Sequence, residues 1–85
     1  MKTFEYTITD PLGIHARPAG MIAAKAKEFT AKITVAKGDK RADARRLFAL
    51  MGLSAKAGDT LLITCNGEDE EAAASALLTL LKENL

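Results

Sequence analysis

The residues best suited to chemistry in this sequence are His15 and Arg17, which stand two positions apart. His15 is the only histidine in the chain, and Pro18 follows close behind it. A neutral imidazole has a free lone pair and can act as a nucleophile. The planar guanidinium of an arginine matches the oxygens of a phosphate group. These side chains at this spacing predict a site where phosphate is held on His15 and contacted by Arg17.

A turn precedes His15 and a helical pattern follows it. From Ala16 to about Glu28, apolar residues recur at spacings of three and four, which predicts an amphipathic helix. Pro18 lies near the start of that helix, where a missing N–H group has no cost. We therefore expect His15 to lie at or next to the N-cap of the helix.

The start of this helix favours a bound anion. Its first N–H groups lack partners within the helix, and the helix dipole adds to their attraction for negative charge. We expect a phosphate on His15 to meet the N–H groups of Ala16 and Arg17, while the ring of Pro18 fixes the chain direction. The dipole also disfavours an imidazolium ion, which favours a neutral, nucleophilic His15. No carboxylate pair frames the motif, so reversible phosphoryl transfer fits better than hydrolysis.

The rest of the chain supplies the elements that must hold this helix start. Alternating residues predict strands, three-and-four spacing predicts helices, and glycines with polar neighbours mark turns. The expected elements are a strand around Phe4–Ile8, a helix over 16–28, strands over 32–37 and 40–43, a brief helix over 47–53, a strand around 61–65 and a last helix from about Asp69 to Lys82. Four strands with amphipathic helices predict an α+β fold, with the helices on one face of one sheet.

Composition narrows the possible classes of function. The 85 residues suffice for a single domain, residues 1–85, with a thin core, so we expect the chemistry at the surface. A net charge of +1 argues against a nucleic-acid-binding protein that relies on bulk charge. Cys65 is the sole cysteine, so we expect no internal disulfide and no cysteine-rich metal site. A pocket for a large cofactor would consume much of the thin core, so we expect no cofactor. No signal-peptide pattern or membrane-spanning run of ~20 apolar residues is present, which predicts a cytoplasmic protein.

The stretch 13–19, with the sequence GIHARPA, resembles the active-site motif of the HPr family. These are the histidine-containing phosphocarriers of the bacterial phosphoenolpyruvate-dependent sugar phosphotransferase system. The likeness extends over essentially the whole chain, including the order of elements and the stretch Ala44–Leu53. The resemblance implies an open-faced β-sandwich, in which three helices cover one face of a four-stranded antiparallel sheet.

The same resemblance implies a function for His15. Enzyme I, which takes phosphate from phosphoenolpyruvate, would phosphorylate His15 on Nδ1, and the phosphate would pass to the IIA domain of a sugar transporter. Arg17 would stabilise the phosphorylated state. The chain would then be a carrier rather than an enzyme, and we expect it to be a monomer.

A carrier must dock on two different proteins, which requires accessible apolar surface beside the histidine. The resemblance implies that the apolar residues of the short second helix face the partners, and methionine suits a surface that accepts several of them. In an arbitrary sequence these residues would more often belong to the core. We expect at least Phe48 to be substantially exposed. The expected partner-binding residues are Met21, Leu47, Phe48, Met51, Arg45 and Arg46, with further positive charge from Arg17 and Lys27.

Four positions depart from the family pattern: Leu12, Gly20, Arg46 and Ala49. In many HPr proteins of Gram-positive bacteria, a serine that is phosphorylated by a dedicated kinase stands at the position of Arg46. Arginine cannot accept that phosphate, so regulation through this position is not expected. Leu12 stands where a hydroxyl residue is common in the family.

Two other classes of function remain open at this point. One is an HPr-like regulatory binding protein whose phosphorylation state signals rather than relays. The intact stretch His15–Pro18 favours the relay. The other is a small enzyme or metalloprotein that uses His15. The chain lacks a second histidine and clustered ligands, which makes this class the weakest.

Overall fold

The helices and strands follow the expected order along the chain. The computed structural model describes residues 1–85. The elements are β1 (Lys2–Thr7), α1 (Ala16–Ala26), β2 (Lys32–Lys37), β3 (Lys40–Asp43), α2 (Leu47–Met51), β4 (Thr60–Asn66) and α3 (Glu70–Asn84). The two strands β2 and β3 have the predicted bounds. Helices α1 and α2 each end two residues earlier than expected.

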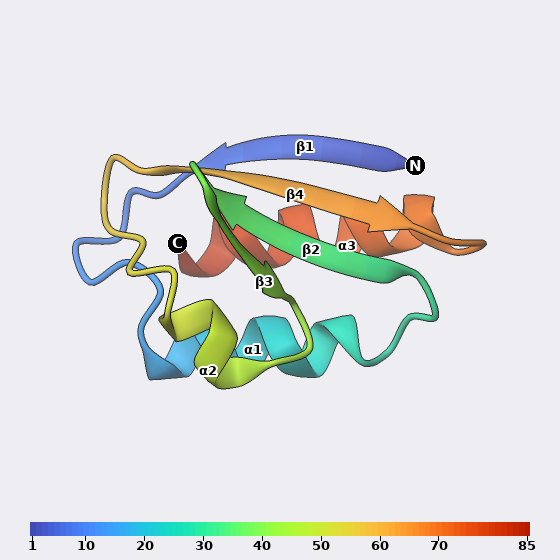
Figure 1. The fold of residues 1–85 in the computed structure, drawn as a ribbon, viewed down its shortest axis with the longest axis horizontal. Coiled ribbons are helices and arrows are strands. Elements are labelled where there is room, and N and C mark those ends of the chain that lie inside the picture. The colour runs from blue at the N-terminus through green and yellow to red at the C-terminus, as the bar shows by residue number, and fades with distance from the viewer.

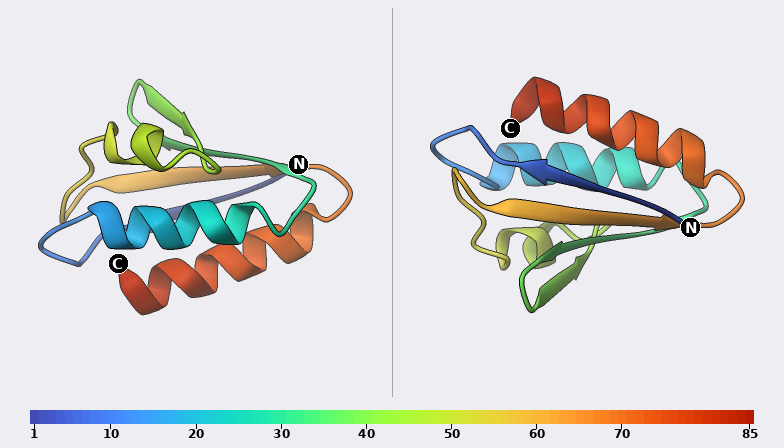
Figure 2. Two further views of the ribbon diagram at one scale, coloured as in Figure 1. Left: turned by 90° about the horizontal axis from the view of Figure 1, so that it is seen from below. Right: turned by 90° about the horizontal axis from the view of Figure 1, so that it is seen from above.

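The four strands form one antiparallel sheet in the order β1-β4-β2-β3. All three helices lie on one face of this sheet, and the other face carries no helix (Figures 1 and 2). The predicted α+β fold, an open-faced β-sandwich with a four-stranded antiparallel sheet, is therefore confirmed. Apolar residues alternate with polar ones along the strands because one face of the sheet meets the helices and the other meets water.

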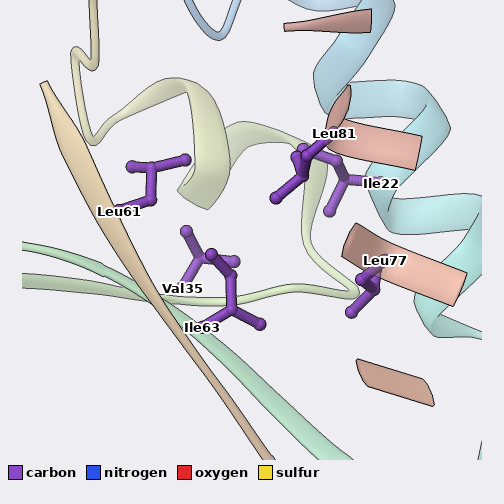
Figure 3. A pocket seen from close by; sticks show the side chains of 6 residues that line it. All are labelled: Ile22, Val35, Leu61, Ile63, Leu77 and Leu81. Atoms are coloured by element: carbon purple, nitrogen blue, oxygen red, sulfur yellow. The ribbon is translucent and has the colours of Figure 1, made fainter. Parts of the chain in front are cut away.

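The core lies between the sheet and the two long helices. Figure 3 shows six side chains from β2, β4, α1 and α3 that point toward one another around a small space. That space measures about 10 Å³, which at most admits a single water molecule. Its walls are entirely apolar: Ile22, Val35, Leu61, Ile63, Leu77 and Leu81. This interior has no room for a substrate, so any chemistry must occur at the surface.

A single carboxylate joins the start of α3 to the segment that connects α1 with β2. One oxygen of Asp69 accepts the N–H of Thr30 and the other accepts the N–H of Ala31, both at 2.8 Å. These donors stabilise the ionised form, and the hydrogen bond from the N–H of Thr30 is the main cause of the lowered pKa of Asp69. Asp69 therefore fixes the end of the molecule that lies opposite the start of α1 (Figure 2).

The loop between β1 and α1 is held by backbone hydrogen bonds. The N–H of Ile14 donates to the carbonyl of Ala55 at 3.0 Å, which ties the loop to the segment between α2 and β4. Gly13 adopts a φ of +62°, and a Cβ at this position would lie 2.0 Å from the carbonyl oxygen of Ala55. Only glycine allows this close approach. The approach places His15 directly at the start of α1.

The last residue of the chain holds the same loop from the other side. The carbonyl oxygen of Leu85 accepts the N–H groups of Thr9 at 2.7 Å and Asp10 at 2.8 Å. The hydroxyl of Thr9 also donates to this oxygen, at 2.8 Å. The end of α3 therefore lies beside the start of α1, as both views in Figure 2 show.

The acid stability of the fold should depend on Asp69. Because its pKa is lowered on folding, ionised Asp69 stabilises the fold above the ordinary value of 3.8. This contribution is lost as the pH falls through the lower folded-state pKa. Asp69→Asn should lower the melting temperature at pH 7 by roughly 5 °C. It should also flatten the fall in melting temperature between about pH 4 and pH 2. Glu68→Gln, an exposed neighbour, is the control for loss of charge, and equal effects of the two variants would contradict this role.

Gly13 and Gly38 offer a matched test of the close approach to Ala55. Both have positive φ, but a Cβ on Gly38 would meet no atom within 4 Å. Gly38→Ala should cost only the backbone strain, roughly 1 kcal/mol. Gly13→Ala adds a clash with backbone atoms and should cost about 3 kcal/mol or more. Urea unfolding measures both values. Equal losses would show that the approach to Ala55 imposes no constraint.

Candidate functional site

His15 lies at the N-cap of α1, as predicted. Its backbone is extended, with φ −100° and ψ −172°, and its carbonyl accepts the N–H of Ala19 at 3.0 Å. The imidazole is half-buried and makes no capping hydrogen bond. Both ring nitrogens are therefore free of protein partners, while the backbone on either side of the residue is held in place.

The first N–H groups of α1 are available to an anion. Ala16 and Arg17 are exposed, and neither backbone N–H donates a hydrogen bond within the protein. Pro18 has no N–H, and its buried ring packs at the start of the helix. The positive end of the helix dipole lies at the same place. A phosphate on His15 would thus meet two unused donors in a favourable field.

An open hollow of about 420 Å³ surrounds His15. Three segments form its wall: the loop after β1, the first turns of α1 and the last turn of α3. Asp10, Leu12, His15, Arg17, Pro18, Met21, Glu83 and Asn84 line it. The sequence predicts the roles of His15, Arg17 and Pro18 here, but it gives no local signal for Glu83 and Asn84. These two residues reach the hollow because α3 packs against α1 and because Leu85 is bound to the loop after β1.

The charges around the hollow are unevenly divided. Arg17 is the one arginine or lysine in its lining, and it forms no ion pair in the structure. Asp10 and Glu83 contribute carboxylates. The carboxylate of Asp10 accepts the N–H of Leu12 at 2.8 Å, so it also shapes the loop. A phosphate in the hollow would be attracted by Arg17 and repelled by both acids.

The predicted exposure of Phe48 is confirmed. Its side chain is 81% exposed, and α2, which carries it, packs against α1. Leu47 and Met51 of α2 are partly buried and pack against the core. Met21 of α1 is also partly buried, and it contributes to the wall of the hollow. The helical face therefore presents apolar surface close to His15.

The two neighbouring arginines at the start of α2 have different environments. The guanidinium of Arg45 is partly buried and donates to the backbone carbonyls of Phe29 and Ala31, the latter at 3.2 Å. These carbonyls follow the far end of α1, which at 1.5 Å per residue lies about 16 Å from its start. Arg46 is exposed and its side chain forms no hydrogen bond or ion pair. Arg45 thus holds two segments together, whereas Arg46 is free to meet a partner.

The remaining candidate groups lie away from this site. No set of three or more histidine, cysteine, aspartate or glutamate side chains lies close enough together to hold a metal ion. Cys65 is buried on β4, and burial raises the pKa of its thiol. No helix combines the length and apolar character required to cross a bilayer.

Known proteins resemble this chain over nearly its whole length. Residues 2–83 match the family model described as the PTS HPr component phosphorylation site. A phosphocarrier protein HPr of Lysinibacillus sphaericus is 46% identical over 98% of this chain and 94% of its own. A phosphocarrier protein NPr of Shewanella violacea is 38% identical over 89% of this chain and 84% of its own.

Solved structures agree with these sequence relationships. The crystal structure of HPr from Thermoanaerobacter tengcongensis superposes with a TM-score of 0.91 at 33% identity, covering 96% of this chain and 92% of that one. A histidine-containing phosphocarrier protein of Mycoplasma gives a TM-score of 0.94 at 29% identity, covering 96% and 93%. The match of sequence, fold and helix-start histidine shows that this chain belongs to the HPr family of phosphocarrier proteins of the phosphotransferase system.

Proposed function

We propose that this chain accepts a phosphoryl group from Enzyme I on Nδ1 of His15 and passes it to the IIA domain of a sugar transporter. The main support is the position of His15, beside the unused N–H groups of Ala16 and Arg17 in an open hollow. In the first step, the Nδ1 lone pair forms a bond to phosphorus. The bond from phosphorus to the donor breaks, and its electron pair stays with the donor. The second step repeats this exchange with Nδ1 as the leaving atom.

The charges of the hollow suit a carrier that must also release its phosphate. Arg17 and the helix start attract the phosphoryl oxygens. Asp10 and Glu83 line the same hollow and oppose the negative charge of the phosphate. This opposition keeps the phosphoryl group from being held too strongly, which supports onward transfer. A protein that retains its phosphate for long periods would instead be expected to surround it with cations alone.

The helical face suits the docking of both partners. We assign the docking surface to Met21, Leu47, Phe48 and Met51, with Arg17 and Arg46 as its exposed cations. Arg45 is excluded because its guanidinium is held by backbone carbonyls. Positive charge around an apolar patch attracts acidic partners and speeds their encounter. Arg46 would serve docking here, in place of regulation by serine phosphorylation.

The proposed role implies a location and an oligomeric state for the chain. Enzyme I and IIA domains would be met in the cytoplasm, and one docking surface allows the chain to act as a monomer. Related structures include one described as an HPr dimer of Thermoanaerobacter tengcongensis. The second candidate is an HPr-like regulatory protein that receives phosphate as a signal and does not pass it on. Transfer to a IIA domain distinguishes the two candidates.

Labelling should identify His15 as the carrier residue. With Enzyme I and labelled phosphoenolpyruvate, the chain should take up one acid-labile phosphoryl group, and His15→Ala should take up none. A later addition of unlabelled IIA domain should remove the label from the chain within the same assay. Label that enters but is never removed would support the signalling candidate. Label retained by His15→Ala would contradict the proposed site.

Salt should lower the rate of phosphoryl transfer, because it screens the cations of the docking surface. Arg46→Gln should lower kcat/KM with Enzyme I about fivefold at low ionic strength, and the difference should shrink at about 0.5 M salt. Arg41→Gln is the matched control, because Arg41 is equally exposed but lies on the uncovered face of the sheet. It should change kcat/KM less than twofold. Equal effects of the two variants, or rates that do not respond to salt, would contradict this docking surface.

A further inference from the structure

Leu12 is a large apolar side chain that the fold leaves in water. It is 70% exposed, and its neighbours in the chain do not cover it. Three other large apolar residues are exposed: Met1, Phe48 and Leu62. Of these four, only Leu12 lines the hollow that holds His15. A leucine exposed to this extent contributes little to the core, and its place beside His15 is what distinguishes it from the other three.

The position of Leu12 is fixed before any partner arrives. Its N–H donates to the carboxylate of Asp10 at 2.8 Å, and the N–H of Gly13 donates to the carbonyl of Asp10 at 3.0 Å. The next residue, Ile14, is buried and bound to the carbonyl of Ala55. A side chain on such a loop loses little backbone freedom when it is covered. Leu12 is therefore ready to be buried at small entropic cost.

Phosphoryl transfer itself requires that Leu12 be covered. For the phosphoryl group to leave His15, an atom of the partner must approach phosphorus to bonding distance. In the proposed function the phosphate on His15 lies in the hollow, so the partner must approach the walls of the hollow. Leu12 forms part of those walls, together with residues of α1 and α3. Polar groups placed against a buried leucine would lose their hydrogen bonds to water.

These steps rest on the proposed function and lead to one conclusion about the partner. We propose that Leu12 is an apolar anchor of the complex with the phosphoryl donor Enzyme I, and that it enters an apolar socket on that protein. The lining of the hollow contains one cation, Arg17, and two acids, Asp10 and Glu83, so it calls for no acidic groups directly over Leu12. Carboxylates of the partner would instead meet the exposed Arg46 at the border of the socket. Phe48 and Leu12 would then each make a separate apolar contact with the partner. Leu12 acts on affinity for the partner and not on the chemical step.

The test compares Leu12→Ala, Leu12→Met and Leu62→Ala as substrates of Enzyme I with phosphoenolpyruvate. Alanine removes the apolar contact without adding a hydroxyl, methionine keeps the apolar area, and Leu62 is an exposed leucine on the uncovered sheet face. Leu12→Ala should raise KM about tenfold and leave kcat within twofold. Leu12→Met and Leu62→Ala should stay within twofold of the unmodified chain in both constants. All three variants should melt within a few degrees of it.

Two results would overturn the anchor while leaving the proposed function intact. One is a KM for Leu12→Ala within twofold of the unmodified chain. The other is a fall in kcat at unchanged KM, which would place Leu12 in the chemical step. A different result, in which Enzyme I fails to phosphorylate even the unmodified chain, would overturn the proposed function and the anchor with it.

Discussion

The approach of Gly13 to the carbonyl of Ala55 is the constraint on which the functional end of the molecule depends. Because no side chain fits between the two backbones, the loop after β1 can donate the N–H of Ile14 to Ala55. The chain then enters α1 directly at His15. If the loop took another path, the imidazole and the unused N–H groups of the helix start would no longer share one location. Because the site consists largely of backbone groups, its geometry depends on the path of the loop that precedes α1.

The small interior leaves only the surface for the groups that we propose to act in docking and transfer. Its apolar interior is filled by side chains from the sheet and from α1 and α3, and the space left over is too small for a ligand. Helix α2 adds apolar surface in Phe48, which the core does not need. The opposite face of the sheet has no helix and shows mainly small and polar side chains. The docking and transfer proposed for the helical face would therefore leave the core undisturbed.

A carrier must hold its phosphate well enough to keep it and weakly enough to give it away. In the proposed function, Arg17 and the start of α1 would attract the phosphate, whereas Asp10 and Glu83 would oppose it. The acids come from opposite ends of the sequence, and the bonds from Thr9 and Asp10 to Leu85 bring them to the same hollow. The end of α3 thus takes part in the balance of charge at a site that the first helix defines.

The sequence alone determined the features that depend on neighbouring residues. Alternation predicted the strands, three-and-four spacing predicted the buried stripe of α1, and the turn before Ala16 predicted that His15 lies at a helix start. Each of these patterns reflects local backbone geometry. The tertiary structure decided what no local pattern contains. In the folded chain, Arg45 donates to a carbonyl beyond the far end of α1, and Asp69 accepts the N–H of Thr30. Glu83 lies in the wall of the hollow. These contacts join residues that are distant in the chain, so they exist only once the order of the strands has brought their elements together.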